Sequence, residues 1–244
     1  MTIESVLLAA ARVSTYHGQQ VLTGASGFFF ERGRRLFLVT SRHVMIDEPS
    51  EHRPDRIQIE VHTDIGNAAA STGFSIPLYR DKKAVWRQGT DTGGEIDVAT
   101  IELDRAALPS EMAYRAFGPE HLETRDSQPA AGTALLIVCF PLGFHDTLHH
   151  LPVVRHAVIA SSWGMRFQGK GYFLTDARTH RGTSGAPVLM AARRSGTHHS
   201  DLPWTLLGVH SSRIDVGSRD VELDEALGLN CAWYADILMT LTEA

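Results

Sequence analysis

Thr179-His180-Arg181-Gly182-Thr183-Ser184-Gly185-Ala186-Pro187-Val188-Leu189 places a serine among small residues, directly before a run that predicts a strand. Glycines on both sides of Ser184 allow a sharp turn with positive φ, so successive N–H groups can face one concavity beside the hydroxyl. Such a concavity can hold an oxyanion, which makes Ser184 a candidate nucleophile. The same residues also suit a simple glycine-rich turn into a strand, so the chemistry depends on partners elsewhere in the chain.

Bulk composition excludes several classes of protein. The chain has 244 residues, of which 43% are hydrophobic and 21% charged, enough for one substantial core or two small ones. A net charge of -5 without a basic stripe argues against nucleic-acid binding. The longest apolar run, residues 134–140, suits a buried strand and is too short to cross a bilayer. We therefore expect neither a nucleic-acid nor a membrane partner.

The two cysteines and the N-terminus bear on the compartment. Cys139 and Cys231 lie far apart in apolar surroundings, which is typical of buried free thiols and not of a disulfide framework. Residues 6–11 are apolar but short, and the residues before them carry Glu4 and no base, so a short helix is favoured over an export signal. Together these features predict a reducing, cytoplasmic location.

The first part of the chain predicts strands. Residues 25–30 and 36–40 are apolar runs on either side of a polar turn, the pattern of a β-hairpin, and His43 follows the second strand. A histidine at such a place is commonly structural, so position alone does not assign its role. Further along we expect a strand at 57–62, a loop at 67–75, a strand at 76–86 and a turn at 89–94.

Asp97 stands at the start of an apolar strand, residues 95–103. A carboxylate at the depth of such a strand costs several kcal/mol, on the order of a desolvated ion, unless it is paired or accepts hydrogen bonds. We therefore expect a histidine or several N–H donors around it. A carboxylate solvated at its tip is an equal alternative for the residue taken alone.

The second part resumes after a polar, proline-containing connection, residues 103–128. Short strands with frequent turns follow, and no alternation of strands with helices appears, which predicts an all-β barrel or sandwich. Residues 233–241 have helical apolar spacing and predict a terminal helix. We place two halves, 1–118 and 128–244, within one domain that spans 1–244.

His43, Asp97 and Ser184 have a definite joint chemistry. A serine hydroxyl needs a base within hydrogen-bond reach, and the base needs an acceptor that fixes its tautomer. The order of these residues, with Ala25-Ser26-Gly27-Phe28, Thr40-Ser41-Arg42-His43 and Phe140-Pro141-Leu142-Gly143, resembles the trypsin-like serine peptidases, particularly bacterial HtrA-type and V8-type enzymes. Two further stretches, Glu95-Ile96-Asp97-Val98-Ala99 and Gly228-Leu229-Asn230-Cys231-Ala232, add to the resemblance.

The resemblance covers nearly the whole chain and implies a chymotrypsin-like fold. Two six-stranded antiparallel β-barrels would flank a cleft, with a short helix at the N-terminus and another at the C-terminus. It implies a serine endopeptidase that cuts proteins or peptides through an acyl-enzyme, without a cofactor. The backbone N–H groups of Gly182 and Ser184 would form the oxyanion hole.

The pocket for the substrate residue before the cut, P1, would be built from Thr179, His210, Ser211 and Ser212. Thr179 and His210 resemble the pair with which glutamate-specific bacterial members hold an acidic side chain, because an imidazole N–H and a hydroxyl are suitable donors. A pocket for small or apolar residues is an equal alternative.

Departures from the family pattern leave a second function open. Thr183 replaces the usual Asp or Asn, Ala186 replaces a glycine, and Arg42 beside His43 would lower the base's pKa if its charge approached the ring. The alternative is a latent or inactive module that binds a peptide or protein, with an activating partner possible.

An α/β-hydrolase fits poorly because Ala186 breaks its motif. The loop histidines, including His149 and His150, are adjacent pairs that share a metal poorly, so no metal site is expected.

Overall fold

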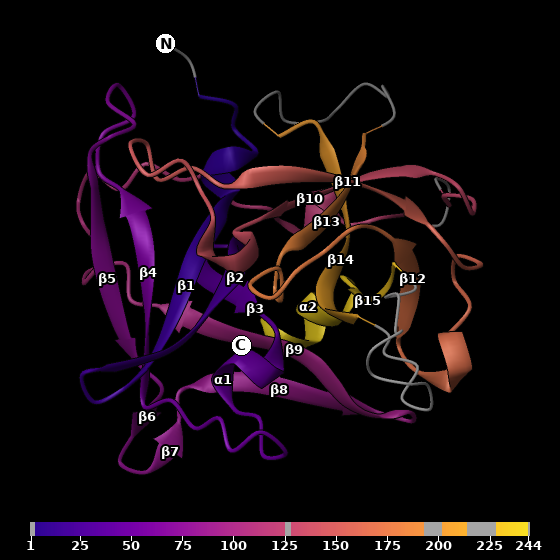
Figure 1. Ribbon diagram of the computed structural model, residues 1–244, viewed down its shortest axis with the longest axis horizontal. Helices are drawn as coiled ribbons and strands as arrows, with labels where there is room; N and C mark the ends of the chain where they lie inside the picture. The colour runs from indigo at the N-terminus through magenta and orange to yellow at the C-terminus, as the bar shows by residue number, and fades with distance from the viewer. Residues whose placement is uncertain (1–2, 125–127, 193–201, 214–227, 244) are drawn as a thin grey trace, which may run out of the picture.

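The computed structural model describes residues 3–124, 128–192, 202–213 and 228–243. The chain is mostly β, and its two halves lie side by side in Figure 1, with the indigo and purple strands of the first half apart from the orange strands of the second. Among the described residues, no helix has the length and apolar character needed to span a membrane.

Seven antiparallel strands of the first half form one sheet in the order β5-β4-β1-β2-β3-β9-β8. The expected hairpin of residues 25–40 is present, with Phe28 opposite Val39 and Arg32 opposite Arg35. The strands are β1 (Ala10–His17), β2 (Gln20–Arg32), β3 (Arg35–Thr40), β4 (Arg56–His62), β5 (Ser71–Pro77), β8 (Trp86–Asp91) and β9 (Gly94–Leu103).

This sheet differs from the six-stranded barrel expected for the first half. Its edge strands, β5 and β8, pair with β4 and β9 respectively, and no pairing between the two edges is found in residues 71–103, all of which are described. The chain between the edges forms a small separate hairpin, β6 (Tyr79–Arg80) and β7 (Lys83–Ala84). A second closed barrel is therefore not present in the strand pairing.

The second half is a closed barrel of six strands in the order β10-β11-β12-β15-β14-β13. Its core is lined by alternate residues of each strand, among them Ile137, Phe173, Val188 and Leu207. The strands are β10 (Ala134–Cys139), β11 (Val153–Ile159), β12 (Tyr172–Asp176), β13 (Pro187–Ala191), β14 (Trp204–Arg213) and β15 (Leu229–Tyr234).

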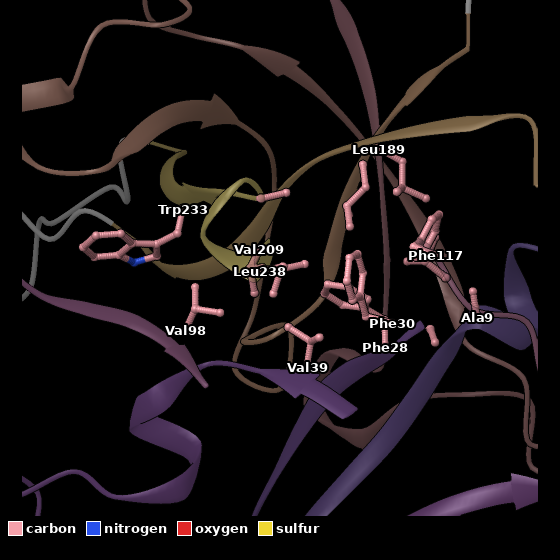
Figure 2. Close-up of a cluster of buried hydrophobic side chains, with 14 of the residues drawn as sticks. Ala9, Phe28, Phe30, Val39, Val98, Phe117, Leu189, Val209, Trp233 and Leu238 are labelled. Atoms are coloured by element: carbon pink, nitrogen blue, oxygen red, sulfur yellow. The ribbon is translucent and has the colours of Figure 1, made fainter. Parts of the chain in front are cut away.

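A separate apolar cluster lies between the two halves and joins them. Figure 2 shows Phe28, Phe30 and Val39 of the first half facing Leu189 and other side chains of the second. Because one buried cluster contains residues of both halves, the halves pack as one unit and fix the position of any site at their border. Labelled members of this cluster also include Ala9, Val98, Phe117, Val209, Trp233 and Leu238.

Helices are short and differ in extent from the sequence prediction. The helix expected at 6–11 is a single 3-10 turn, η1 (Leu7–Ala9), because Ala10 onward pairs with β2 as a strand. The helix expected at 233–241 is confined to α2 (Ile237–Leu241), because residues up to Tyr234 complete the barrel as β15. The other short helices among the described residues are α1 (Arg42–Met45), η2 (Pro119–His121), η4 (Pro141–Gly143) and η5 (Phe167–Gly169).

The C-terminal helix α2 binds to the first half of the chain. Arg32 donates to the Met239 carbonyl at 2.5 Å, and Thr100 donates its hydroxyl to the Leu241 carbonyl at 3.2 Å. These bonds satisfy carbonyl groups at a helix end that have no partner within the helix. The end of the chain thus ties the second half to the sheet of the first.

Candidate active site

His43 lies on the one-turn helix α1, directly after β3. The end of β3 pairs with β9, with Thr40 opposite Ala99, so α1 begins beside the strand that carries Asp97. Asp97 accepts the backbone N–H of His43 at 2.8 Å and bonds to its ring Nδ1 at 2.7 Å. The expected pairing of this carboxylate with a histidine is therefore present.

Asp97 is the fourth residue of β9, and its side chain is 22% exposed. Besides the two bonds from His43, its Oδ2 accepts a bond from the hydroxyl of Ser211 on β14. Three donors thus surround one partly buried carboxylate, as its desolvation requires. Ser211 was expected among the substrate-binding residues, whereas its hydroxyl contacts Asp97.

Ser184 lies in the turn before β13, on the opposite side of the border between the halves. Its hydroxyl is half-buried and donates to the Ser211 carbonyl at 3.0 Å. Within the described part of the chain, the hydrogen bond of this hydroxyl goes to Ser211 and not to His43. Ser211 nevertheless contacts both sides of the site, because its carbonyl accepts from Ser184 and its hydroxyl donates to Asp97, which bonds to His43.

The His43 ring is 35% exposed and its protonation depends on Asp97. Burial lowers the pKa of His43, but the hydrogen bond and the charge of Asp97 outweigh burial, so the pKa is raised above its ordinary value. The charge of Arg42 lowers the pKa of His43, but it has a smaller effect than burial or Asp97. A raised pKa makes the His43 ring a better proton acceptor.

Arg42 is held by acidic and polar side chains. Its guanidinium pairs with Glu48 at 3.2 Å and with Glu95 at 3.5 Å, and its Nε donates to Gln88 at 2.6 Å. Two carboxylates therefore offset its charge beside the His43 ring. The departure from the family pattern at this position has a local electrostatic explanation.

Gly182 and Gly185 are both required by the turn that contains Ser184. Their φ angles are +91° and +85°, in the region that favours glycine. A Cβ on Gly182 would lie 2.6 Å from the Phe140 carbonyl oxygen, and one on Gly185 would lie 2.3 Å from that of Ser26. Any side chain at either position would therefore collide with backbone as well as strain φ.

The N–H of Gly182 is oriented by its neighbours. Leu142 donates its N–H to the Arg181 carbonyl at 2.6 Å. Because a trans peptide points its C=O and N–H in opposite directions, the Gly182 N–H faces away from Leu142. In the described part of the chain, the backbone N–H groups of Gly182 and Ser184 have no protein acceptor, whereas that of Gly185 donates to the His210 carbonyl.

The predicted P1 residues occupy different environments. His210 is buried at 2% exposure, its Nδ1 has no hydrogen-bond partner in the described residues, and burial lowers its pKa to about 3. Thr179 is also buried, and its hydroxyl donates to Asn230 at 2.5 Å. Ser212 is exposed. His210 is therefore a buried histidine whose Nδ1 lacks a partner among the described residues, and the hydroxyl proton of Thr179 is already used in a hydrogen bond.

Neither a metal cluster nor a disulfide is found in the part of the chain that the structure describes. No three His, Cys, Asp or Glu side chains there are arranged to hold a metal ion. His149 bonds to Asp146 at 2.6 Å. Cys139 and Cys231 are free and buried, and burial raises the pKa of the Cys139 thiol to about 11.

One known protein family matches most of the chain, including the candidate active site. A family model described as a trypsin-like peptidase domain matches residues 25–194, which include His43, Asp97 and Ser184. The chain belongs to the trypsin-like peptidase family. No curated protein sequence matched it.

Solved structures similar to this trypsin-like peptidase are distant in sequence. The serine endoprotease from Yersinia pestis is 16% identical with a TM-score of 0.56, over 97% of this chain and 62% of that one. A serine-to-alanine mutant of Rv3671c from M. tuberculosis H37Rv, in an inactive form, is 12% identical with a TM-score of 0.51, over 98% of this chain and 89% of that one. These likenesses show the fold, and this chain spans about three fifths of the Yersinia protein.

Proposed function

We propose that this trypsin-like peptidase is a serine endopeptidase with Ser184 as nucleophile, His43 as base and Asp97 as the acceptor that orients the base. The observation that carries this proposal is the pair of hydrogen bonds that His43 makes to Asp97. One comes from the backbone N–H at 2.8 Å and the other from the ring Nδ1 at 2.7 Å. With Nδ1 donating to the carboxylate, Nε2 of the ring is the free base.

The proposed reaction begins once the Ser184 hydroxyl has turned from the Ser211 carbonyl toward His43. Ser184 Oγ attacks the scissile carbonyl carbon while its proton passes to His43 Nε2. The C–N bond then breaks, the same proton goes to the leaving amine, and an ester on Ser184 remains. Water activated by His43 hydrolyses that ester and restores the hydroxyl. The backbone N–H groups of Gly182 and Ser184 hold the oxyanion, and each such donor contributes on the order of 3 kcal/mol.

We propose further that the substrate residue before the cut is Glu or Asp, as the resemblance of Thr179 and His210 to glutamate-specific members implies. His210 carries this proposal as the expected pocket residue, but its Nδ1, unpartnered among the described residues, is buried, so a substrate carboxylate would reach the ring only after the side chains that cover it move aside. Thr179 then acts through Asn230 and not as a direct donor, because its hydroxyl proton is used there. Peptide-library digestion tests this preference. Enrichment of acidic P1 residues that is lost in His210→Gln supports it, and cleavage mainly after apolar residues contradicts it.

One observation favours a latent state as the second candidate. The Ser184 hydroxyl donates to the Ser211 carbonyl at 3.0 Å, so attack requires it to turn toward His43. In a latent module the cleft would bind a peptide without cutting it until a partner or substrate turned this side chain. Peptide that binds but stays intact would be the signature of this state.

Digestion of denatured casein distinguishes the two candidates. New peptides, identified by mass spectrometry with wild-type protein and missing with Ser184→Ala, support the peptidase. An intact substrate after prolonged incubation with folded wild-type protein, under conditions in which a control peptidase cuts, supports the latent module.

A further inference from the structure

Ser26 of β2 lies beneath the turn that contains Ser184. It is fully buried, at 0% exposure, and comes from the other half of the chain. Its Oγ donates to the Gly182 carbonyl at 2.7 Å and accepts the Phe140 N–H at 2.9 Å. A hydroxyl has a single hydrogen, and the bond from Phe140 occupies a lone pair, so the hydrogen is directed at Gly182.

The backbone of Ser26 makes two further bonds at the same place. Its N–H donates to the Ser184 carbonyl at 2.9 Å, and its carbonyl accepts the Thr40 hydroxyl at 2.7 Å. Ser26 therefore holds the carbonyls of Gly182 and Ser184, which lie on either side of Thr183. Thr183 is fully buried, and its hydroxyl makes no hydrogen bond to the turn in the described residues. The turn is thus fixed by its backbone and not by that side chain.

Gly182 needs such external control because its own conformation is permissive. A glycine can rotate its flanking peptides at little steric cost. Here Leu142 fixes the peptide before Gly182 by binding the Arg181 carbonyl, and Ser26 fixes the peptide after it by binding the Gly182 carbonyl. With both peptides held, the direction of the Gly182 N–H is set.

We propose that Ser26 is a positioning residue, whose hydroxyl keeps the Gly182 N–H aimed at the oxyanion formed during catalysis. The inference rests on the proposed peptidase function and adds to it a residue that does not touch the substrate. Donors that are oriented before the reaction need no rearrangement when charge develops, so loss of the orienting bond affects the transition state more than substrate binding.

Ser26→Ala is the direct test, and Thr15→Val is its matched control. Thr15 is a fully buried hydroxyl in the same sheet that also accepts an N–H, from Thr23 at 3.0 Å, and donates within its own strand pair. Loss of the Thr15 hydroxyl removes a pair of hydrogen bonds similar to those of Ser26, but at a place away from the turn that contains Ser184. Both variants are assayed with a fluorogenic peptide taken from the strongest cleavage site in casein, and with an aldehyde of the same peptide as a transition-state mimic.

We expect the kcat of Ser26→Ala to fall about 10- to 100-fold, with KM changed less than about threefold. The affinity for the aldehyde should fall in parallel, and Thr15→Val should keep a kcat within about twofold of wild type. If Ser26→Ala does not fold, Ser26→Cys replaces it, because a thiol fills the space and is a weak donor. The same loss in kcat is expected for Ser26→Cys.

A folded Ser26→Ala protein with more than half of the wild-type kcat would overturn the inference and leave the peptidase function intact. An equal loss in Thr15→Val would also overturn it, since the effect would then reflect general loosening. Wild-type protein inert toward both casein and a fluorophosphonate would instead contradict the peptidase function, and the role of Ser26 with it.

Discussion

Asp97 holds His43 at two points, accepting the backbone N–H on Oδ1 at 2.8 Å and bonding ring Nδ1 through Oδ2 at 2.7 Å. The backbone bond fixes the position of α1 relative to β9, and the ring bond fixes the orientation of the imidazole. A single carboxylate thus sets both the position and the ring tautomer of His43. The first prediction follows from this double contact.

Asp97→Asn should lower kcat by about 10³- to 10⁴-fold, because an amide can donate to Nδ1 and so hold the wrong tautomer. The measurement is steady-state hydrolysis of a fluorogenic peptide, with circular dichroism to show that the fold is retained. Asp91→Asn is the matched control, since Asp91 at the end of β8 pairs with Arg166 at 2.7 Å, outside the proposed triad. If the kcat of Asp97→Asn stayed within tenfold of the wild-type kcat, Asp97 would not be the group that orients His43.

The pH dependence should follow the raised pKa of His43. Catalysis needs the neutral ring, so kcat/KM should rise with pH, with a midpoint above 6.5, the ordinary pKa of histidine. The raised pKa also contributes stability that is fully present below the pKa of the unfolded chain and lost as pH rises through the folded-state value. In Asp97→Asn the midpoint of residual activity should move down. A wild-type midpoint below 6.5 would show that burial outweighs Asp97.

The cluster that joins the two halves should control stability. Leu238 of α2 is fully buried in this cluster, and Leu238→Ala should lower the free energy of unfolding by about 2–5 kcal/mol. Leu148 is 64% exposed, and Leu148→Ala should change the free energy of unfolding by less than about 0.5 kcal/mol. Urea titration followed by tryptophan fluorescence measures both. Equal effects would mean that α2 does not pack on the first half in solution.

Both thiols should be unreactive in the folded protein. Cys139 is fully buried with its pKa raised to about 11, and Cys231 is 8% exposed with its pKa also raised by burial. Thiolate is the reactive species, so Ellman's reagent should modify neither residue without denaturant and both with it. Rapid modification of the native protein would show that one of these strands opens readily.

Some of the fold follows directly from the sequence. Residues 25–30 and 36–40 are apolar runs on either side of a polar turn and form the predicted hairpin, and the barrel strands of the second half are short apolar runs separated by turns. β5 (Ser71–Pro77) overlaps a stretch predicted as loop, because an edge strand is largely exposed and lacks an apolar pattern. Its pairing with β4 comes from backbone bonds, which composition does not reveal.

The candidate site was predictable where local motifs carry it. His43, Asp97 and Ser184 each stand in a recognisable motif, and the structure places His43 and Asp97 in contact. The contact of Ser211 with Asp97 and the bonds from Ser26 to the turn connect residues more than 100 positions apart. Such long-range contacts depend on how the two halves pack, and nothing in the local sequence encodes them.

Labelling with a fluorophosphonate tests the central claim most directly. The reagent transfers its phosphonyl group to a base-activated serine, and intact-protein mass spectrometry with peptide mapping locates the adduct. We predict one adduct on Ser184 in wild-type protein, and none in Ser184→Ala or His43→Ala. A folded wild-type protein that remains unlabelled while a control peptidase reacts, or labelling that persists in His43→Ala, would contradict a serine nucleophile activated by His43.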